Sequence, residues 1–81
     1  MSWFLYIVQC RDTSLYTGVT TDIPRRIKEH NAKKGARYTR NKMPVRLVYQ
    51  ELMGDRSLAS KREAQIKKFT RKQKLVLIGV C

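Results

Sequence analysis

Two runs of strand-forming residues lie near the start of the chain, WFLYIV at residues 3–8 and LYTGVT at residues 15–20. Aromatic and β-branched residues of this kind favour strands, and the first run is apolar on both alternating faces, which is typical of a strand covered on each side. Turn-forming residues, CRDTS at 10–14, separate the runs, so we expect a hairpin. Gly18 inside the second strand indicates a bulge or a close approach to the backbone.

A helix is expected after the hairpin, because Thr21 or Asp22 can serve as its N-cap and Pro24 suits a first turn. We expect this helix to continue to the lysines before Gly35, since glycine commonly ends a helix.

Helical spacing of about 100° per residue places Ile23, Ile27 and Asn31 on one side of that helix. Arg26 and His30 lie four residues apart along the edge of this side. We therefore expect the Arg26–His30 pair to border the sheet without lying in the middle of the core.

A third strand is predicted at residues 45–53, with Val45, Leu47 and Tyr49 on one face. A longer helix follows, for which Asp55 or Ser57 is the cap. Its expected apolar stripe comprises Leu58, Ala59, Ile66 and Phe69.

Thr70 and Gln73 have the pattern of a capping box, which predicts a last helix at residues 71–79. Its docking residues should be Leu75, Val76 and Ile78. The predicted element order is ββαβαα, an α/β fold of the α+β type, in a single domain spanning residues 1–81.

Charge indicates the partner. Eighteen Lys and Arg residues against six Asp and Glu give a formal net charge of +12. Solubility alone needs a net charge of only about 2–8 in a small domain. An excess of this size concentrates polyanions near the protein, so nucleic acid is the first partner to consider.

The cysteines, the histidine and the apolar runs argue against a disulfide-bonded protein, a zinc protein and a membrane protein. Cys10 and Cys81 have no CxxC spacing and indicate free thiols in a reducing compartment. With a single histidine besides, a structural zinc site lacks its usual ligands. The apolar runs near the two ends of the chain are shorter than the roughly 20 residues of a membrane helix. We therefore expect a cytoplasmic protein.

Few residues here can perform proton or metal chemistry. Three of the six acids have structural roles available as helix caps or turn residues, and two more face water on a helix or end a strand. The sixth, Glu63, borders an apolar face among basic residues. Glu63 could bind a metal or act in catalysis, or could be an ion-pair partner of Arg26 or a nearby lysine. Tyr6 and Tyr16 could share one surface, because neighbouring strands lie about 4.8 Å apart, or could simply pack.

These residues and their spacing resemble the sequence motifs of a known protein family. Phe4-Leu5-Tyr6 and, ten residues beyond Tyr6, Tyr16-Thr17-Gly18 resemble the paired signatures of the GIY-YIG nuclease superfamily. TDIPRRIKEHN at 21–31 is similar to the family's arginine helix with its following histidine, and EAQIKK at 63–68 to its glutamate helix.

Two segments in the middle of the chain resemble one group within this superfamily. GARYTR at 35–40 and PVRLVY at 44–49 resemble the small bacterial UPF0213 group of that superfamily. The resemblance implies a three-stranded antiparallel sheet flanked by helices. It also implies an endonuclease that hydrolyses phosphodiester bonds of nucleic acid, DNA more than RNA, with a divalent metal.

The resemblance also implies roles for five side chains. Glu63 would hold one weakly bound Mg²⁺ or Mn²⁺ ion, and Arg26 would bind the phosphate. Tyr6 would act as general base on the attacking water, or position it, with Tyr16 and His30 assisting. Because a free phenol has a pKa near about 10, Tyr6 can act as a base only where a cation stabilises its anion.

Further residues would hold the nucleic-acid backbone. They are Gly18, the loop residues Arg37, Tyr38, Arg40 and Lys42, and Lys67 of the glutamate helix. Three functions stay open on these residues alone. The protein could be a weak or partner-recruited nuclease, a non-catalytic nucleic-acid-binding protein on the same fold, or a basic scaffold protein without a nucleic-acid role.

Overall fold

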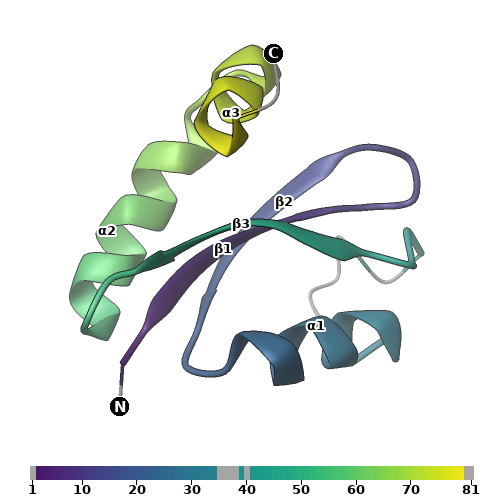
Figure 1. Ribbon diagram of the computed structural model, residues 1–81, viewed down its shortest axis with the longest axis horizontal. Coiled ribbons are helices and arrows are strands. Elements are labelled where there is room, and N and C mark those ends of the chain that lie inside the picture. Colours follow the sequence, from purple (N-terminus) through teal and green to yellow (C-terminus); the bar gives the residue numbers. More distant parts are fainter. Residues whose placement is uncertain (1, 35–38, 40, 80–81) are drawn as a thin grey trace.

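A computed structural model describes residues 2–34, 39 and 41–79 of the chain. The three strands form one antiparallel sheet in the order β2-β1-β3, and three helices flank it, which confirms the predicted fold class and the order ββαβαα (Figure 1). The elements are β1 (Phe4–Gln9), β2 (Leu15–Thr20), α1 (Ile23–Asn31), β3 (Arg46–Leu52), α2 (Arg56–Lys67) and α3 (Arg71–Ile78).

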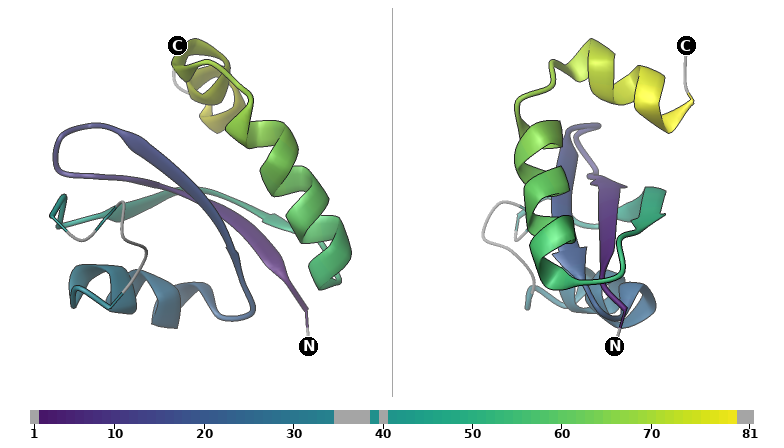
Figure 2. Two further views of the ribbon diagram at one scale, coloured as in Figure 1. Left: turned by 180° about the vertical axis from the view of Figure 1, so that it is seen from behind. Right: turned by 90° about the vertical axis from the view of Figure 1, so that its left-hand side faces the viewer.

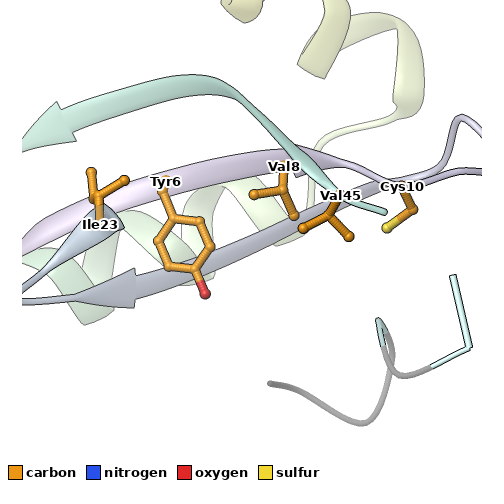
Figure 3. Packing of buried hydrophobic residues seen from close by; sticks show 5 residues of the cluster. All are labelled: Tyr6, Val8, Cys10, Ile23 and Val45. Atoms are coloured by element: carbon orange, nitrogen blue, oxygen red, sulfur yellow. The ribbon is translucent and has the colours of Figure 1, made fainter. Parts of the chain in front are cut away.

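One face of the sheet is covered by α1. Side chains at alternate positions of β1 point to this face, where they meet Ile23 of α1 and the segment that leads into β3. Figure 3 shows the cluster, which comprises Tyr6, Val8, Cys10, Ile23 and Val45. Because strand side chains alternate, β1 contributes its remaining apolar residues to the opposite face.

The opposite face is covered by α2 and α3 (Figure 2). Leu5 and Ile7 of β1 are fully buried there against Ile66 of α2. Two predicted core positions are wrong, because Leu58 is 48% exposed and Val76 is 69% exposed. A helix buries only the stripe that faces the sheet, and each of these residues lies about 100° from the neighbour that packs.

A β-bulge in β3 overturns the predicted alternation. Ile7 pairs with Tyr49 whereas Val8 pairs with Leu47, so Val48 is an extra residue in β3. As a result Val45 packs on the α1 face and Tyr49 on the α2 face, although the period-two pattern predicted one face for both. The pattern could not reveal the insertion, since a bulge depends on how β3 pairs with β1.

Local hydrogen bonds satisfy backbone groups at both ends of α1. The Asp22 carboxylate caps the helix by accepting from the Arg25 amide at 3.0 Å. The helix ends earlier than predicted, at Asn31, because Lys33 adopts a left-handed conformation with φ 63°. The amides of Lys33 and Lys34 then donate back to the carbonyls of His30 and Glu29, at 3.3 and 2.8 Å.

Asn31 connects α1 to the start of β3. Its side-chain oxygen accepts from the Val45 amide at 2.7 Å, and its Nδ2 donates to the Val45 carbonyl at 3.2 Å. Both backbone groups of a residue that is only 4% exposed are thereby satisfied. This clamp fixes the position of α1 along the sheet.

The remaining helix caps agree with the sequence. Asp55 caps α2, and Thr70 with Gln73 forms the predicted capping box of α3. Across the described part of the chain, no helix combines the length and the apolar composition needed to cross a membrane.

Candidate active site

The two tyrosines of the hairpin lie on the same face of the sheet. Tyr6 pairs with Gly18 and Tyr16 pairs with Val8, which places both side chains on the α1 side. Their ring centroids are 6.5 Å apart. The expectation that the two tyrosines share a surface therefore agrees with the strand register.

Arg26 and His30 of α1 both contact the hydroxyl of Tyr6. Arg26 Nε donates to Tyr6 Oη at 3.3 Å, and His30 Nε2 lies 2.9 Å from the same oxygen. Because the two α1 residues are one helical turn apart, they bring a permanent cation and an imidazole to one phenol. The His30 ring also makes an edge contact with Tyr16, with 5.5 Å between centroids.

His30 is buried more deeply than the sequence indicated. It is 0% exposed, so the expectation that the Arg26–His30 pair lies outside the middle of the core is wrong for the histidine. Burial is tolerated because both ring nitrogens have partners. Nδ1 lies 2.7 Å from Oγ1 of Thr39, which is itself fully buried.

Thr39 is a site residue that sequence reasoning missed. It lies among the loop residues chosen for their charge or aromatic ring, but a threonine in such a loop carries no pattern of its own. Only the folded structure places its hydroxyl against His30.

Burial keeps both members of the Tyr6–His30 pair neutral at rest. It raises the pKa of Tyr6, and the hydrogen bond and charge of Arg26 only partly oppose this effect. It also lowers the pKa of His30, with the Arg26 charge acting in the same direction. At neutral pH the site therefore holds a phenol and a neutral imidazole.

Gly18 is required by the position of the Tyr6 ring. A Cβ at this position would lie 2.6 Å from Tyr6 Oη and 2.8 Å from Cζ. The space next to Gly18, which the sequence analysis left for the substrate backbone, thus holds the catalytic candidate itself. No larger residue fits while Tyr6 keeps its contacts.

Arg26 is partly open to solvent and can bind an anion. Its side chain is 28% exposed, and its Nη1 donates to Glu29 at 3.2 Å. The Glu29 carboxylate in this pair is itself 38% exposed. Among the described residues Nη2 has no hydrogen-bond partner, so its donors can bind a phosphate oxygen.

Glu63 belongs to α2, which packs along β2, a strand at one edge of the sheet. Its side chain is 24% exposed and pairs with Lys67 at 3.3 Å. The pKa of Tyr6 depends mainly on burial, and then on Arg26 and Tyr16. The negative charge of Glu63 has a smaller effect, which also raises this pKa. The structure thus brings four of the five catalytic candidates into direct contact, whereas Glu63 lies on α2 and acts on Tyr6 through its charge.

A magnesium or manganese ion fits Glu63 only in a site of low protein ligation. Among residues 2–34, 39 and 41–79 there is no group of three or more acidic, histidine or cysteine side chains that could hold a metal. Mg²⁺ commonly binds one or two carboxylates and completes its shell with water and substrate phosphates. A single partly exposed carboxylate is compatible with that mode.

The expected binding residues are distributed unevenly over the described part of the chain. Lys42 lies beside the hairpin turn, where its Nζ is 3.5 Å from Asp12. Lys67 is 53% exposed on α2. Arg37, Tyr38 and Arg40 lie outside the described residues.

Comparison with known proteins gives a family match over most of the chain. The family model described as the GIY-YIG catalytic domain matches residues 2–75. A UPF0213 protein of Desulfotalea psychrophila is 63% identical over 78 residues, covering 93% of this chain and 71% of that protein. A UPF0213 protein of Staphylococcus haemolyticus is 55% identical over 75 residues, with 93% and 92% covered.

Solved structures extend the likeness to three dimensions. The solution NMR structure of a UPF0213 protein from Bacillus halodurans has a TM-score of 0.63 and 42% identity, covering 98% of this chain and 84% of that one. A protein from E. faecalis, also solved by NMR, has a TM-score of 0.66, 43% identity and the same coverage. The chain therefore belongs to the GIY-YIG nuclease superfamily and, within it, to the UPF0213 group.

Proposed function

We propose that this protein is an endonuclease that hydrolyses phosphodiester bonds of nucleic acid with the help of one divalent metal ion, and that DNA is its preferred substrate. The observation that carries the proposal is the Tyr6 hydroxyl, which lies between Arg26 Nε and His30 Nε2. Membership of a nuclease superfamily supports it.

Tyr6 is the proton acceptor in this proposal. Because its pKa is raised, Tyr6 is a neutral phenol, not a phenolate, at neutral pH. It can accept a proton from the attacking water only while it passes its own proton to His30 Nε2, 2.9 Å away. Tyr16 packs against the His30 ring and helps to hold it toward Tyr6.

Arg26 stabilises charge in the reaction. A phosphodiester gains negative charge on its equatorial oxygens when water attacks, and fixed donors aimed at that charge lower the barrier. The Nη2 donors of Arg26 belong to the same guanidinium group that donates to the Tyr6 hydroxyl. The phosphate would thus bind next to the group that accepts the water proton.

Glu63 would hold the metal ion, since it is the partly exposed carboxylate whose charge acts on Tyr6. Such an ion supplies Lewis-acid stabilisation of the phosphate and the leaving oxygen. The ion pair with Lys67 is compatible with this role, because exposed pairs of this kind contribute only about 0.2–1 kcal/mol.

Basic side chains around the junction of α2 and α3 would bind the backbone of the substrate. Lys67, Lys68, Arg71 and Lys72 are exposed there, and no acidic residue follows Glu63 in the sequence. Basic residues at the start of α3 oppose its helix dipole, so stability of the helix does not explain them. Arg71 Nη1 also donates to the Thr13 carbonyl at 2.9 Å, which leaves the rest of its guanidinium for the substrate. Lys42 and the loop residues Arg37, Tyr38 and Arg40 complete the proposed binding set.

The decisive experiment compares Glu63→Gln with the wild type on labelled branched, duplex and single-stranded DNA and RNA, with Mg²⁺ or Mn²⁺. We expect the wild type to cut DNA, and we expect the variant to lose at least about 10²-fold in rate, as removal of a metal or charge-stabilising group does. Binding should persist or tighten, because the variant carries one negative charge fewer.

Asp12→Asn is the matched control, since it removes the same charge from an exposed turn residue. It should keep full cleavage. For both variants and the wild type, affinity should fall steeply with salt, as backbone binding requires. Salt-dependent binding without any cleavage by the wild type would refute the nuclease and leave the non-catalytic binding protein.

A further inference from the structure

The hydrogen bonds around Tyr6 and His30 have only one fully satisfied arrangement of protons. An arginine can only donate, so Tyr6 Oη accepts the Nε–H of Arg26. Tyr6 is 1% exposed, and its own hydroxyl proton therefore needs a partner inside the protein. Among the described residues the acceptor within reach is His30 Nε2, at 2.9 Å.

This arrangement decides the tautomer of His30. If Nε2 accepts from Tyr6, the neutral imidazole carries its proton on Nδ1, and that N–H must donate to Thr39 Oγ1 at 2.7 Å. In the opposite tautomer Tyr6 Oη would receive two donors, and its buried proton would have no acceptor among the described residues. Burying an unpaired polar group is costly, which disfavours that alternative.

We propose that Thr39 is a positioning residue that pairs the Nδ1–H of His30 and thereby stabilises the tautomer whose unprotonated Nε2 faces Tyr6. The proposal rests on the proposed nuclease function. It adds a residue that touches neither substrate nor reacting atoms and acts through the histidine.

The tautomer of His30 decides whether Nε2 can accept the hydroxyl proton of Tyr6 during the reaction. As the water oxygen bonds to phosphorus and the P–O bond to the leaving oxygen breaks, one water proton moves to Tyr6 Oη and the Tyr6 proton moves to His30 Nε2. The leaving oxyanion takes its proton from solvent, and the imidazolium later returns one to solvent. In the other tautomer Nε2 already carries a proton and cannot accept a second.

Thr39 serves the imidazolium as well as the neutral ring. Its oxygen accepts the Nδ1–H in both states, and a hydrogen bond to a charged donor is the stronger one. The groups that face His30 are Tyr6, Tyr16, Arg26, Glu29 and Thr39. Of these, Glu29 also favours the imidazolium, whereas Arg26 opposes it.

NMR can read the tautomer directly, because His30 is the sole histidine of the sequence. Nitrogen-15 shifts and long-range couplings of the imidazole distinguish Nδ1–H from Nε2–H. In the wild type we expect the Nδ1–H form. A wild type in the Nε2–H form overturns the proposal without any variant.

Thr39→Val keeps the shape of the side chain and removes the acceptor. We expect it to shift His30 toward the Nε2–H form and to lower kcat about 10- to 100-fold, the scale of a general acid–base contribution. The affinity for DNA should be unchanged. Thr39→Ser, which restores the hydroxyl, should recover the Nδ1–H form and most of the rate.

Thr17→Val is the matched control. Thr17 is a buried threonine of β2 whose Oγ1 has no partner among the described residues, and its position in the strand puts it on the opposite face from Tyr16. This variant should leave the His30 signal and the cleavage rate unchanged. Thr39→Val with an unchanged tautomer or an unchanged kcat overturns the proposal.

The experiment separates this proposal from the nuclease itself. A wild type in the Nδ1–H form that cuts no nucleic acid refutes the proposed function and with it the catalytic meaning of Thr39. Cleavage by a protein whose His30 responds to Thr17→Val as strongly as to Thr39→Val refutes the positioning role alone. If Thr39→Val fails to fold, the wild-type tautomer and the Thr39→Ser rate still decide.

Discussion

Gly18→Ala tests how closely the fold and the candidate site depend on one another. The added Cβ would lie 2.6, 2.8 and 3.0 Å from Oη, Cζ and Cε1 of Tyr6. Real Cβ atoms do not approach other atoms so closely, so the ring must move. Tyr6 is 1% exposed, and its hydroxyl contacts Arg26 and His30. The ring therefore cannot move without loss of these contacts.

The expected cost follows from three terms. Overpacking a core costs about 1–3 kcal/mol, and a lost hydrogen bond between Tyr6 and His30 adds about 1 kcal/mol. The lower entropy of the unfolded alanine chain offsets about 0.4–1 kcal/mol, because Gly18 does not need a positive φ. We expect a net loss of about 1–3.6 kcal/mol, and each kcal/mol lowers Tm by about 4–8 °C in a domain of this size.

Denaturant unfolding followed by the fluorescence of Trp3 measures this loss, since it is the single tryptophan of the chain and lies under the Arg56 guanidinium. Gly54→Ala is the control. Gly54 has a φ of 86° and an added Cβ would meet nothing within 4 Å, so its cost of about 1 kcal/mol comes from backbone strain alone. Only Gly18→Ala should also shift the His30 imidazole signals.

A double-mutant cycle isolates the collision. Tyr6→Phe removes Oη, the nearest atom, and leaves the ring carbons, so Gly18→Ala should cost less in the Tyr6→Phe background. Equal costs in both backgrounds, or a Gly18→Ala protein as stable as the wild type with unmoved His30 signals, would show that the ring does not fill this space.

Two further predictions concern the same helix. Because the pKa of His30 is lowered in the folded state, the unfolded chain binds a proton at His30 first as the pH falls. The free energy of unfolding should therefore decline as the pH falls from just above the ordinary histidine pKa of about 6.5 to the folded pKa. The slope should reach about 1.4 kcal/mol per pH unit. Urea unfolding between about pH 8 and 5 checks this, and a stable His30→Gln variant with the same slope would contradict it. Asn31→Ala should cost about 1–3 kcal/mol, because it leaves the buried Val45 amide without its partner. Asn41→Ala, at an exposed position, should cost almost nothing in the same unfolding assay. Equal effects of the two substitutions would argue against the clamp.

Several elements of the fold were predictable because their signals are local. The hairpin needs only strand-forming runs with turn residues between them, and its register then puts Tyr6 and Tyr16 on one face. Caps at Asp22 and Thr70 depend on side chains that bond amides three residues away. Such features are encoded within a few residues, so the sequence pattern is sufficient.

The end of α1 shows the limit of local signals. Glycine at 35 predicted a longer helix, yet a lysine adopts the left-handed conformation two residues earlier. The Asn31 clamp on Val45 lies just before this point, and it joins segments 14 residues apart. A non-local contact of this kind is invisible in the propensity of either segment.

By itself, the sequence determined the class of fold, the strongly basic character of the surface and the identity of the five catalytic candidates. Tertiary structure alone decided where they lie relative to one another. It buried His30 completely, inserted the bulge at Val48, placed the Tyr6 ring over Gly18 and brought Thr39 to the imidazole. The physical reason is that hydrogen bonding and packing of buried groups depend on every element around them, whereas caps, turns and strand alternation depend only on neighbours in the chain.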